Sequence, residues 1–169
     1  MLLQILVMKV LIIGDTHGYN ENMWNVIKKE EPVDMVIHCG DVEMPYEQLR
    51  SRINATLHVV SGNNDYDSDL RNIDVFNIGR FKAVLVHGHR YHIYSSLDSL
   101  FYLGMENQAD LVIFGHVHVP VVQQEGPVTL VSPGSLTYPR QRGRVPSYII
   151  MTVEDVGMPK FEVKYVENA

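Results

Sequence analysis

Seven side chains, in five short polar clusters along the chain, have the types and spacing that could carry out chemistry. They are two aspartates, one asparagine and four histidines, namely Asp15, His17, Asp41, Asn63, His87, His116 and His118. This mixed set of oxygen and nitrogen ligands suits a pair of divalent transition metals better than a single structural zinc ion. Two such ions about 3.5–4 Å apart can polarise a phosphoryl oxygen and lower the pKa of a bridging water. The set therefore predicts metal-assisted hydrolysis.

The spacing within the clusters indicates how the ligands could be shared. Asp15 and His17 stand two positions apart, as do His116 and His118. In an extended or turn segment this spacing lets both side chains of a pair face one ion, and the second pair could serve the same ion or its neighbour. Asp41 stands alone after a glycine, which makes it the natural bridging carboxylate. Any one cluster is common by chance, so the prediction depends on the ordered set.

The ordered set resembles the calcineurin-like metallophosphoesterase superfamily. The most specific segments are Gly14-Asp15-Thr16-His17-Gly18, Gly115-His116-Val117-His118 and Ser132-Pro133-Gly134-Ser135. The match runs from about Met8 to near the C-terminus. The chain is most similar to the small single-domain bacterial and archaeal phosphodiesterases, which are related to the metal-site subunit of the retromer coat.

The resemblance implies a fold and a ligand set. The fold would be an α/β, four-layered α-β-β-α sandwich of two facing mixed sheets. One ion would be held by Asp15, His17, Asp41 and His118, and a second by Asp41, Asn63, His87 and His116. Among divalent metals manganese is favoured, and iron, nickel, cobalt and zinc are also compatible with these ligands. A homodimer or homotetramer would suit the family.

One position departs from the family pattern. Many members carry a histidine directly after the ligand asparagine, where this chain has Asn64. Asparagine can donate a hydrogen bond but cannot act as a general acid near neutral pH. We therefore expect activated aryl phosphodiesters to be cleaved much faster than alkyl esters. The small branch often lacks this histidine too, so Asn64 supports that branch rather than an inactive protein.

Two further residues are candidates for contact with the substrate. His89 follows His87 by two positions and could act as an alternative acid or phosphate contact, although a solvated loop histidine is slightly favoured. Arg140 follows the Ser-Pro-Gly-Ser segment, and its planar guanidinium suits phosphate, but an exposed basic turn fits equally well. The candidate catalytic residues are thus Asp41, Asn64 and His89, and Arg140 is the candidate substrate contact.

Apolar runs before most of the clusters predict the strands that must position them. The predicted strands are 9–13, 34–38, 56–60, 73–78, 81–87, 111–114, 120–124, 128–132, 147–153 and 160–166. The predicted helices are 21–30, 45–53 and 96–107. Strand and helix alternate in the first half, which predicts a parallel sheet, whereas the last third predicts antiparallel strands that complete a second sheet. Ligands at the carboxyl ends of parallel strands lie where open α/β sheets place their sites.

Length and composition favour one enzyme domain over residues 1–169. The hydrophobic content of 46% is ordinary for a globular protein, and the net charge of −6 argues against broad nucleic-acid binding. A single cysteine, Cys39, permits no intramolecular disulfide and fits a cytoplasmic protein. The apolar stretch 1–13 is too short to span a membrane. Residues 1–7 could be an extension, with Met8 as an alternative start.

The sequence thus predicts a dinuclear metal-dependent phosphodiesterase that acts on small phosphodiesters. A phosphomonoesterase is the nearest alternative. A catalytically silent, metal-binding scaffold for another protein is the alternative from a different class. All seven ligand positions hold competent residues, which favours the enzyme.

Overall fold

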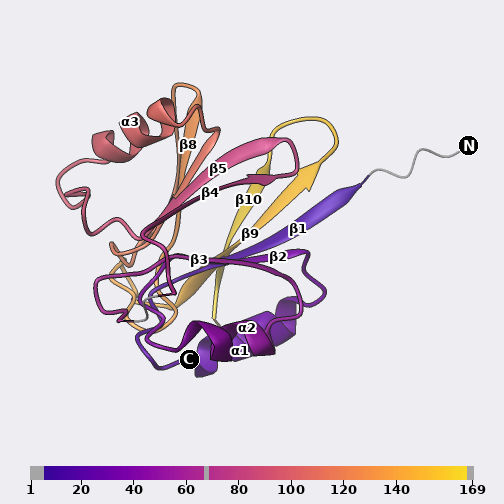
Figure 1. The fold of residues 1–169 in the computed structure, drawn as a ribbon, viewed down its shortest axis with the longest axis vertical. Helices are drawn as coiled ribbons and strands as arrows, with labels where there is room; N and C mark the ends of the chain where they lie inside the picture. The colour runs from indigo at the N-terminus through magenta and orange to yellow at the C-terminus, as the bar shows by residue number, and fades with distance from the viewer. Residues whose placement is uncertain (1–5, 67–68, 167–169) are drawn as a thin grey trace, which may run out of the picture.

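Two five-stranded sheets face each other across an apolar core (Figure 1). The computed structural model describes residues 6–66 and 69–166, so residues 1–5 of the predicted extension lie outside the described part. The first sheet has the order β10-β9-β1-β2-β3 and the second the order β4-β5-β6-β8-β7. The strands of the first sheet are β1 (Val7–Ile13), β2 (Met35–His38), β3 (Thr56–Val59), β9 (Ser147–Glu154) and β10 (Lys160–Tyr165). Those of the second are β4 (Ile73–Ile78), β5 (Phe81–Val86), β6 (Leu111–Phe114), β7 (Pro120–Glu125) and β8 (Val128–Pro133).

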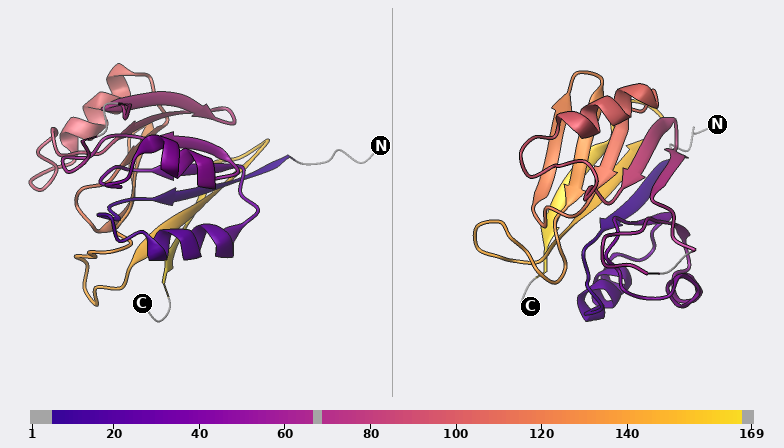
Figure 2. Two further views of the ribbon diagram at one scale, coloured as in Figure 1. Left: turned by 60° about the horizontal axis from the view of Figure 1, so that its bottom comes forward. Right: turned by 60° about the vertical axis from the view of Figure 1, so that its left-hand side comes forward.

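Within the described residues, three helices cover the outer faces of the two sheets (Figure 2). The helices α1 (Glu21–Glu30) and α2 (Tyr46–Arg52) pack on the first sheet, and α3 (Asp98–Glu106) packs on the second. The predicted four-layered α-β-β-α sandwich of two mixed sheets is therefore confirmed. None of the helices in the described residues has both the length and the apolar composition needed to cross a membrane.

The alternation of side chains along β1 shows why its sequence is almost continuously apolar. Val10 and Ile12 point into the core between the sheets, whereas Leu11 and Ile13 point toward α1 and α2. Successive side chains of a strand face opposite sides, so a strand covered on both faces needs apolar residues at every position. β1 is such a strand, and this places its carboxyl end and Asp15 in the interior of the molecule.

The last two strands belong to the first sheet, so the prediction that they complete the second sheet was wrong. β9 pairs antiparallel with β1, and β10 pairs antiparallel with β9. The reason is burial on two sides, because Ile149 and Met151 fill the core between the sheets while Tyr148 and Ile150 pack with α1 and α2. The antiparallel prediction holds for β8 on the side of β7, but on its other side β8 runs parallel to β6.

The carboxyl ends of five strands carry the polar clusters. β1, β2 and β3 are mutually parallel in the first sheet, and β5 and β6 are parallel in the second. Backbone hydrogen bonds join these ends, since Asp15 N–H donates to the Gly40 carbonyl and Gly115 N–H donates to the His87 carbonyl.

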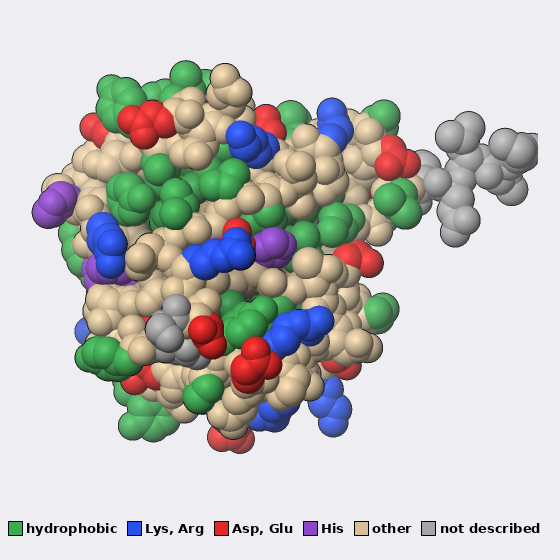
Figure 3. Space-filling model, in the orientation of Figure 1, with side chains coloured by type: hydrophobic (Ala, Val, Ile, Leu, Met, Phe, Trp, Pro, Cys, Tyr) green, Lys and Arg blue, Asp and Glu red, His purple; other side chains and the backbone are tan. Residues whose placement is uncertain are grey.

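On the face shown in Figure 3, basic and acidic side chains are interspersed rather than gathered by sign.

Candidate metal centre

Three histidines of the centre are oriented through their Nδ1 atoms. The contacts are His17 Nδ1 to Glu43 Oε1 at 2.9 Å, His87 Nδ1 to the Cys39 carbonyl at 2.7 Å, and His118 Nδ1 to the Tyr138 carbonyl at 2.7 Å. Carbonyl and carboxylate oxygens only accept, so each Nδ1 carries a proton and donates it. Each ring then turns its Nε2 atom toward the centre, which is how metal-binding histidines are usually held.

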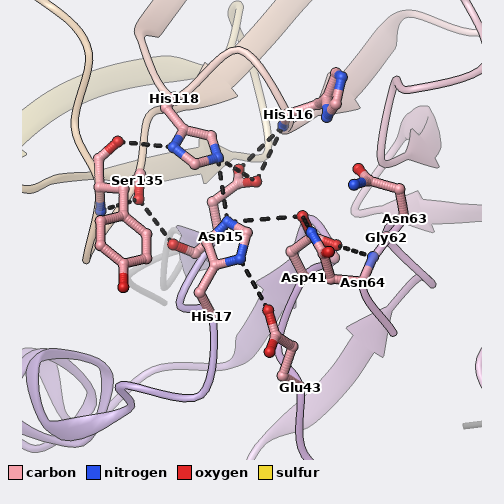
Figure 4. A network of polar contacts seen from close by, with 12 residues as sticks. Asp15, His17, Asp41, Glu43, Gly62, Asn63, Asn64, His116, His118 and Ser135 are labelled. Carbon is pink, nitrogen blue, oxygen red and sulfur yellow. Dashed lines mark hydrogen bonds and ion pairs between the residues drawn. The ribbon is translucent and has the colours of Figure 1, made fainter. Parts of the chain in front are cut away.

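Two buried carboxylates meet these Nε2 atoms, and Figure 4 shows the contacts of His17 and His118. Asp15 Oδ1 lies 3.1 Å from His118 Nε2, and Asp41 Oδ2 lies 3.4 Å from His87 Nε2 and 3.6 Å from His17 Nε2. The side chains of Asp15 and Asp41 are only 0% and 2% exposed. Two groups of ligand atoms result, each with its atoms within 4.8 Å of one another: Asp15, His17 and His118, and Asp15, Asp41 and His87.

This donor set fits a bound cation. The Nε2 atoms of His17 and His118 lie 3.3 Å apart with their Nδ1 positions already occupied. Two neutral imidazoles in this arrangement direct lone pairs at each other and at a buried carboxylate, which is unfavourable without positive charge between them. A divalent ion would supply that charge, because imidazole nitrogen and carboxylate oxygen are both ligands of such ions.

The pKa shifts of Asp41 and His87 also indicate that the centre favours positive charge. Burial alone raises the pKa of the Asp41 carboxyl, but hydrogen bonds and charge from His87, with the N–H groups of Asn64, outweigh it and hold this pKa well below its usual range. Burial lowers the pKa of His87, but Asp41 and Asp15 outweigh it and raise the pKa above its usual value. The centre therefore attracts a cation.

The remaining two predicted ligands differ in placement. Asn63 Oδ1 lies 3.1 Å from His87 Nε2 and so joins the cluster. The backbone N–H of His116 donates to Asp15 Oδ2 at 3.0 Å, but its ring points away from both carboxylates in Figure 4. That ring packs beside His87, with the two centroids 5.1 Å apart, and burial and the charge of His87 lower the His116 pKa to about 4.

Left-handed backbone accompanies the ligands. Six non-glycine residues of these loops have positive φ: Asp15 (52°), His17 (50°), Asp41 (52°), Glu43 (50°), His116 (69°) and His118 (56°). Non-glycine residues rarely adopt this conformation, and it persists only where the surrounding structure enforces it. Here the loops after β1 and β2 hold each other, because the N–H groups of His17 and Gly18 donate to the carbonyls of Asp41 and Val42.

Gly62 allows the close approach of Asp41. A Cβ atom at this position would collide with the Asp41 carboxylate and its backbone N–H. Asp65, three residues on, accepts hydrogen bonds from the N–H groups of Gly62 and Glu43 at 2.8 and 2.7 Å. The turn after β3 thereby fixes the turn after β2.

The segment after β8 supports the centre in a way that the sequence did not reveal. Ser135 Oγ donates to the Asp15 carbonyl at 2.7 Å and accepts from the N–H of Tyr138 at 2.8 Å. Tyr138 in turn offers the carbonyl that orients His118. The Ser-Pro-Gly-Ser motif was the available signal for this role, whereas nothing in the sequence singled out Glu43.

The predicted catalytic and substrate residues lie around the same centre. The backbone N–H and Nδ2 of Asn64 donate to the two carboxylate oxygens of Asp41, at 2.8 and 2.9 Å, so Asn64 braces this aspartate. Arg140 is exposed, and its Nη1 donates to Tyr94 Oη at 2.6 Å and to the His116 carbonyl at 3.4 Å. His89 lies beside His87, with ring centroids 5.4 Å apart.

A two-sheet sandwich with aspartate, asparagine and histidine at adjacent strand ends defines a metal-dependent phosphoesterase. Residues 8–156 match the family model of the calcineurin-like phosphoesterase superfamily domain, and the chain belongs to this family. A probable metallophosphoesterase of Bacillus subtilis is 36% identical over 149 residues, which cover 88% of this chain and 86% of that protein. A phosphodiesterase of Methanocaldococcus jannaschii is 30% identical over 148 residues, covering 75% of this chain and 83% of that protein.

Solved structures share the fold. A predicted phosphoesterase of Streptococcus pneumoniae has a TM-score of 0.82 at 28% identity, covering 96% of this chain and 91% of that chain. Vps29 of Entamoeba histolytica, solved in complex with Zn²⁺, has a TM-score of 0.71 at 24% identity, covering 94% of this chain and 99% of that chain.

Proposed function

We propose that this chain is a phosphodiesterase that uses two divalent ions to hydrolyse small phosphodiesters. The observation that carries the proposal is the convergence of three Nε2 atoms on two buried carboxylates, with each Nδ1 held by an oxygen. The similarity of this chain to a phosphodiesterase of Methanocaldococcus jannaschii supports a phosphodiester, rather than a phosphomonoester, as the proposed substrate.

Each ion has a proposed set of ligands. Asp15, His17, Asp41 and His118 would hold one, and Asp41, Asn63, His87 and His116 the other. When bound, the ions would activate water for attack on phosphorus and stabilise the charge that develops there. Asp41 is suited to serve both, since its Oδ2 lies within 3.6 Å of both His17 Nε2 and His87 Nε2. Manganese remains the favoured metal, with iron, nickel, cobalt or zinc as alternatives.

Residues of the chain itself position the reaction. Asn64 fixes the Asp41 carboxylate through two hydrogen bonds, and an amide so placed does not protonate a leaving group. Arg140, held by Tyr94 beside His116, presents a guanidinium that can pair with a phosphate oxygen. A cytoplasmic location and a homodimer or homotetramer stay predictions.

The proposal is tested with bis(p-nitrophenyl) phosphate. Protein stripped with a chelator should be inactive, should regain turnover with Mn²⁺, and should release p-nitrophenol faster from this diester than from p-nitrophenyl phosphate. Asp41→Asn should lose at least roughly 100-fold in kcat/KM, because it weakens both ion sites at once. A wild-type protein that binds two ions but does not turn over would instead indicate the scaffold function, and a preference for the monoester would indicate a phosphomonoesterase.

A further inference from the structure

Arg90 determines which nitrogen of His89 carries the proton. Arg90 Nε donates to His89 Nε2 at 3.3 Å. A guanidinium is a donor only, so His89 Nε2 must accept, and the proton of the neutral ring is on Nδ1.

The resulting Nδ1–H group lacks an acceptor. His89 Nδ1 is buried and makes no hydrogen bond to any described residue. A buried donor left unpaired costs about 1–3 kcal/mol, so native structures provide an acceptor from protein, water or ligand. The ring lies beside His87 and His116, with centroids 5.4 and 6.2 Å away. Both of these histidines belong to the proposed second ion site.

The charges around the centre indicate what kind of acceptor would bind. A cavity of about 200 Å³ is lined by His87, His89 and Arg90, and no carboxylate side chain is among its described lining residues. A second cavity, of about 540 Å³, borders the centre at Asn64 and has four carboxylates in its lining: Glu43, Glu47, Asp65 and Asp69. An anionic oxygen is therefore favoured on the His89 side and repelled on the Asn64 side.

We propose that His89 is a catalytic residue whose Nδ1–H donates a hydrogen bond to an anionic phosphoryl oxygen of the substrate, and that Arg90 is the residue that positions it. This inference rests on the proposed function. It assigns to His89 a donor in addition to the side-chain amide of Asn64, one N–H of which is used on Asp41.

The first test reads the tautomer without metal or turnover. Long-range ¹H–¹⁵N NMR spectra of the metal-free protein should show His89 protonated at Nδ1 and not at Nε2. In Arg90→Met the constraint is removed, and protonation at Nε2 should appear. A wild-type ring protonated at Nε2 would overturn the proposal, as would a tautomer unaffected by Arg90→Met.

The second test compares two substitutions of His89 whose side-chain amides take the places of different ring nitrogens. In His89→Asn the side-chain amide replaces Nδ1, whereas in His89→Gln it replaces Nε2. With metal-loaded protein and bis(p-nitrophenyl) phosphate, His89→Gln should lose roughly 10- to 100-fold in kcat/KM, as for one donor to a charged oxygen. His89→Asn should lose only a few-fold. Equal losses in the two variants would exclude a role for the Nδ1–H group.

Binding of inorganic phosphate separates this inference from the proposed function. Calorimetry on the metal-loaded proteins should show weaker binding in His89→Gln and near-normal binding in His89→Asn, even if the wild type does not turn over the diester. Unchanged phosphate binding in both variants would show that His89 does not contact the phosphoryl group. His92→Asn is the matched control, because His92 is exposed, lies in the same loop and has a positive φ that asparagine tolerates. It should leave turnover and phosphate binding unchanged.

Discussion

Three oxygen atoms orient the three inward-facing histidines, and one of them belongs to a side chain, that of Glu43. His17 depends on it, whereas His87 and His118 donate to backbone carbonyls that no substitution removes. Glu43 is also held by its own backbone, since its N–H donates to Asp65. The orientation of His17 is therefore the one whose hydrogen-bond acceptor a substitution can remove.

We predict that Glu43→Gln weakens binding of the ion at His17. The amide oxygen still accepts from His17 Nδ1 but no longer carries charge, so the ring becomes a poorer ligand. Loss of such a partner typically costs 10- to 100-fold in metal affinity, and retention of an acceptor places the expected loss at roughly 10-fold. Calorimetric titration with Mn²⁺ measures it. Glu47→Gln makes the same change at an exposed site in the first turn of α2 and should bind like the wild type. Equal affinities in Glu43→Gln and wild type would contradict the prediction.

The sequence identified ligands better than it identified their supports. Asp15 and Asp41 could be predicted because each follows an apolar strand at a parallel sheet's carboxyl end, and periodicity reveals such strands. Glu43 could not, because its contact with His17 depends on left-handed backbone at residue 43, which sequence patterns indicate mainly for glycine and asparagine. The orientation of the His116 ring likewise depends on its neighbours rather than on spacing.

At the scale of elements, one buried carboxylate joins a helix to three strands. Glu30, the last residue of α1, accepts from Tyr148 Oη of β9 at 2.8 Å and Lys164 Nζ of β10 at 2.9 Å, and pairs with Lys9 Nζ of β1 at 3.0 Å. Burial raises the pKa of its carboxyl, but the hydrogen bonds from Lys164, Tyr148 and Lys9 outweigh it and lower the pKa from 4.5 to about 2. The ionised form is thus favoured by folding.

This network predicts a loss of stability in acid. Because the folded pKa is the lower one, its contribution is complete above pH 4.5 and disappears as the pH falls toward 2. The shift corresponds to about 3 kcal/mol of unfolding free energy. Glu30→Gln should lose about this amount at pH 7 and should depend less on pH between 4.5 and 2, as measured by urea unfolding at a series of pH values.

The matched control for Glu30 lies on β10. Glu162 is exposed, and Glu162→Gln should change the unfolding free energy by less than about 0.5 kcal/mol. If Glu30→Gln behaved like Glu162→Gln at pH 7, the network would not stabilise the attachment of α1 to the first sheet.

Sequence patterns predicted the bounds of the strands and helices more reliably than the strands with which each strand pairs. Each described strand and helix lies within two residues of its predicted range, because apolar periodicity is local. The sheet to which β9 belongs is decided by contacts with β1 far away in the chain, and local periodicity contains no information about it. The error over β9 and β10 has this origin.

At the scale of the whole molecule, the metal centre lies where the two sheets meet. Asp15, Asp41 and Asn63 follow strands of the first sheet, whereas His87 and His118 follow strands of the second. Ions held by both sets would connect the two sheets at one end of the core. Metal binding at this candidate site would therefore be linked to folding of the sandwich as a unit.

We predict that metal raises the unfolding temperature. A ligand that binds only the folded state contributes about 2.7 kcal/mol when its free concentration is 100 times its Kd. Thermal unfolding of chelator-treated protein, followed during titration with Mn²⁺, should show a midpoint that rises with metal concentration. Asp41→Asn should reduce this rise, since the residue contacts histidines from both sheets. If the midpoint did not change although metal had been shown to bind the folded protein, the unfolded chain would have to bind the metal equally well.

The position of β1 between β2 and β9 has a consequence for synthesis of the chain on the ribosome. Residues 10–13 pair with β2 along one edge of β1, whereas residues 7–12 pair along the other edge with residues 149–154, which are synthesised much later. Until β9 emerges, this strongly apolar strand has a row of unpaired N–H and carbonyl groups, which is an edge open to other chains. Closure of the first sheet therefore requires a contact of very long sequence separation, which slows folding and makes it a late event.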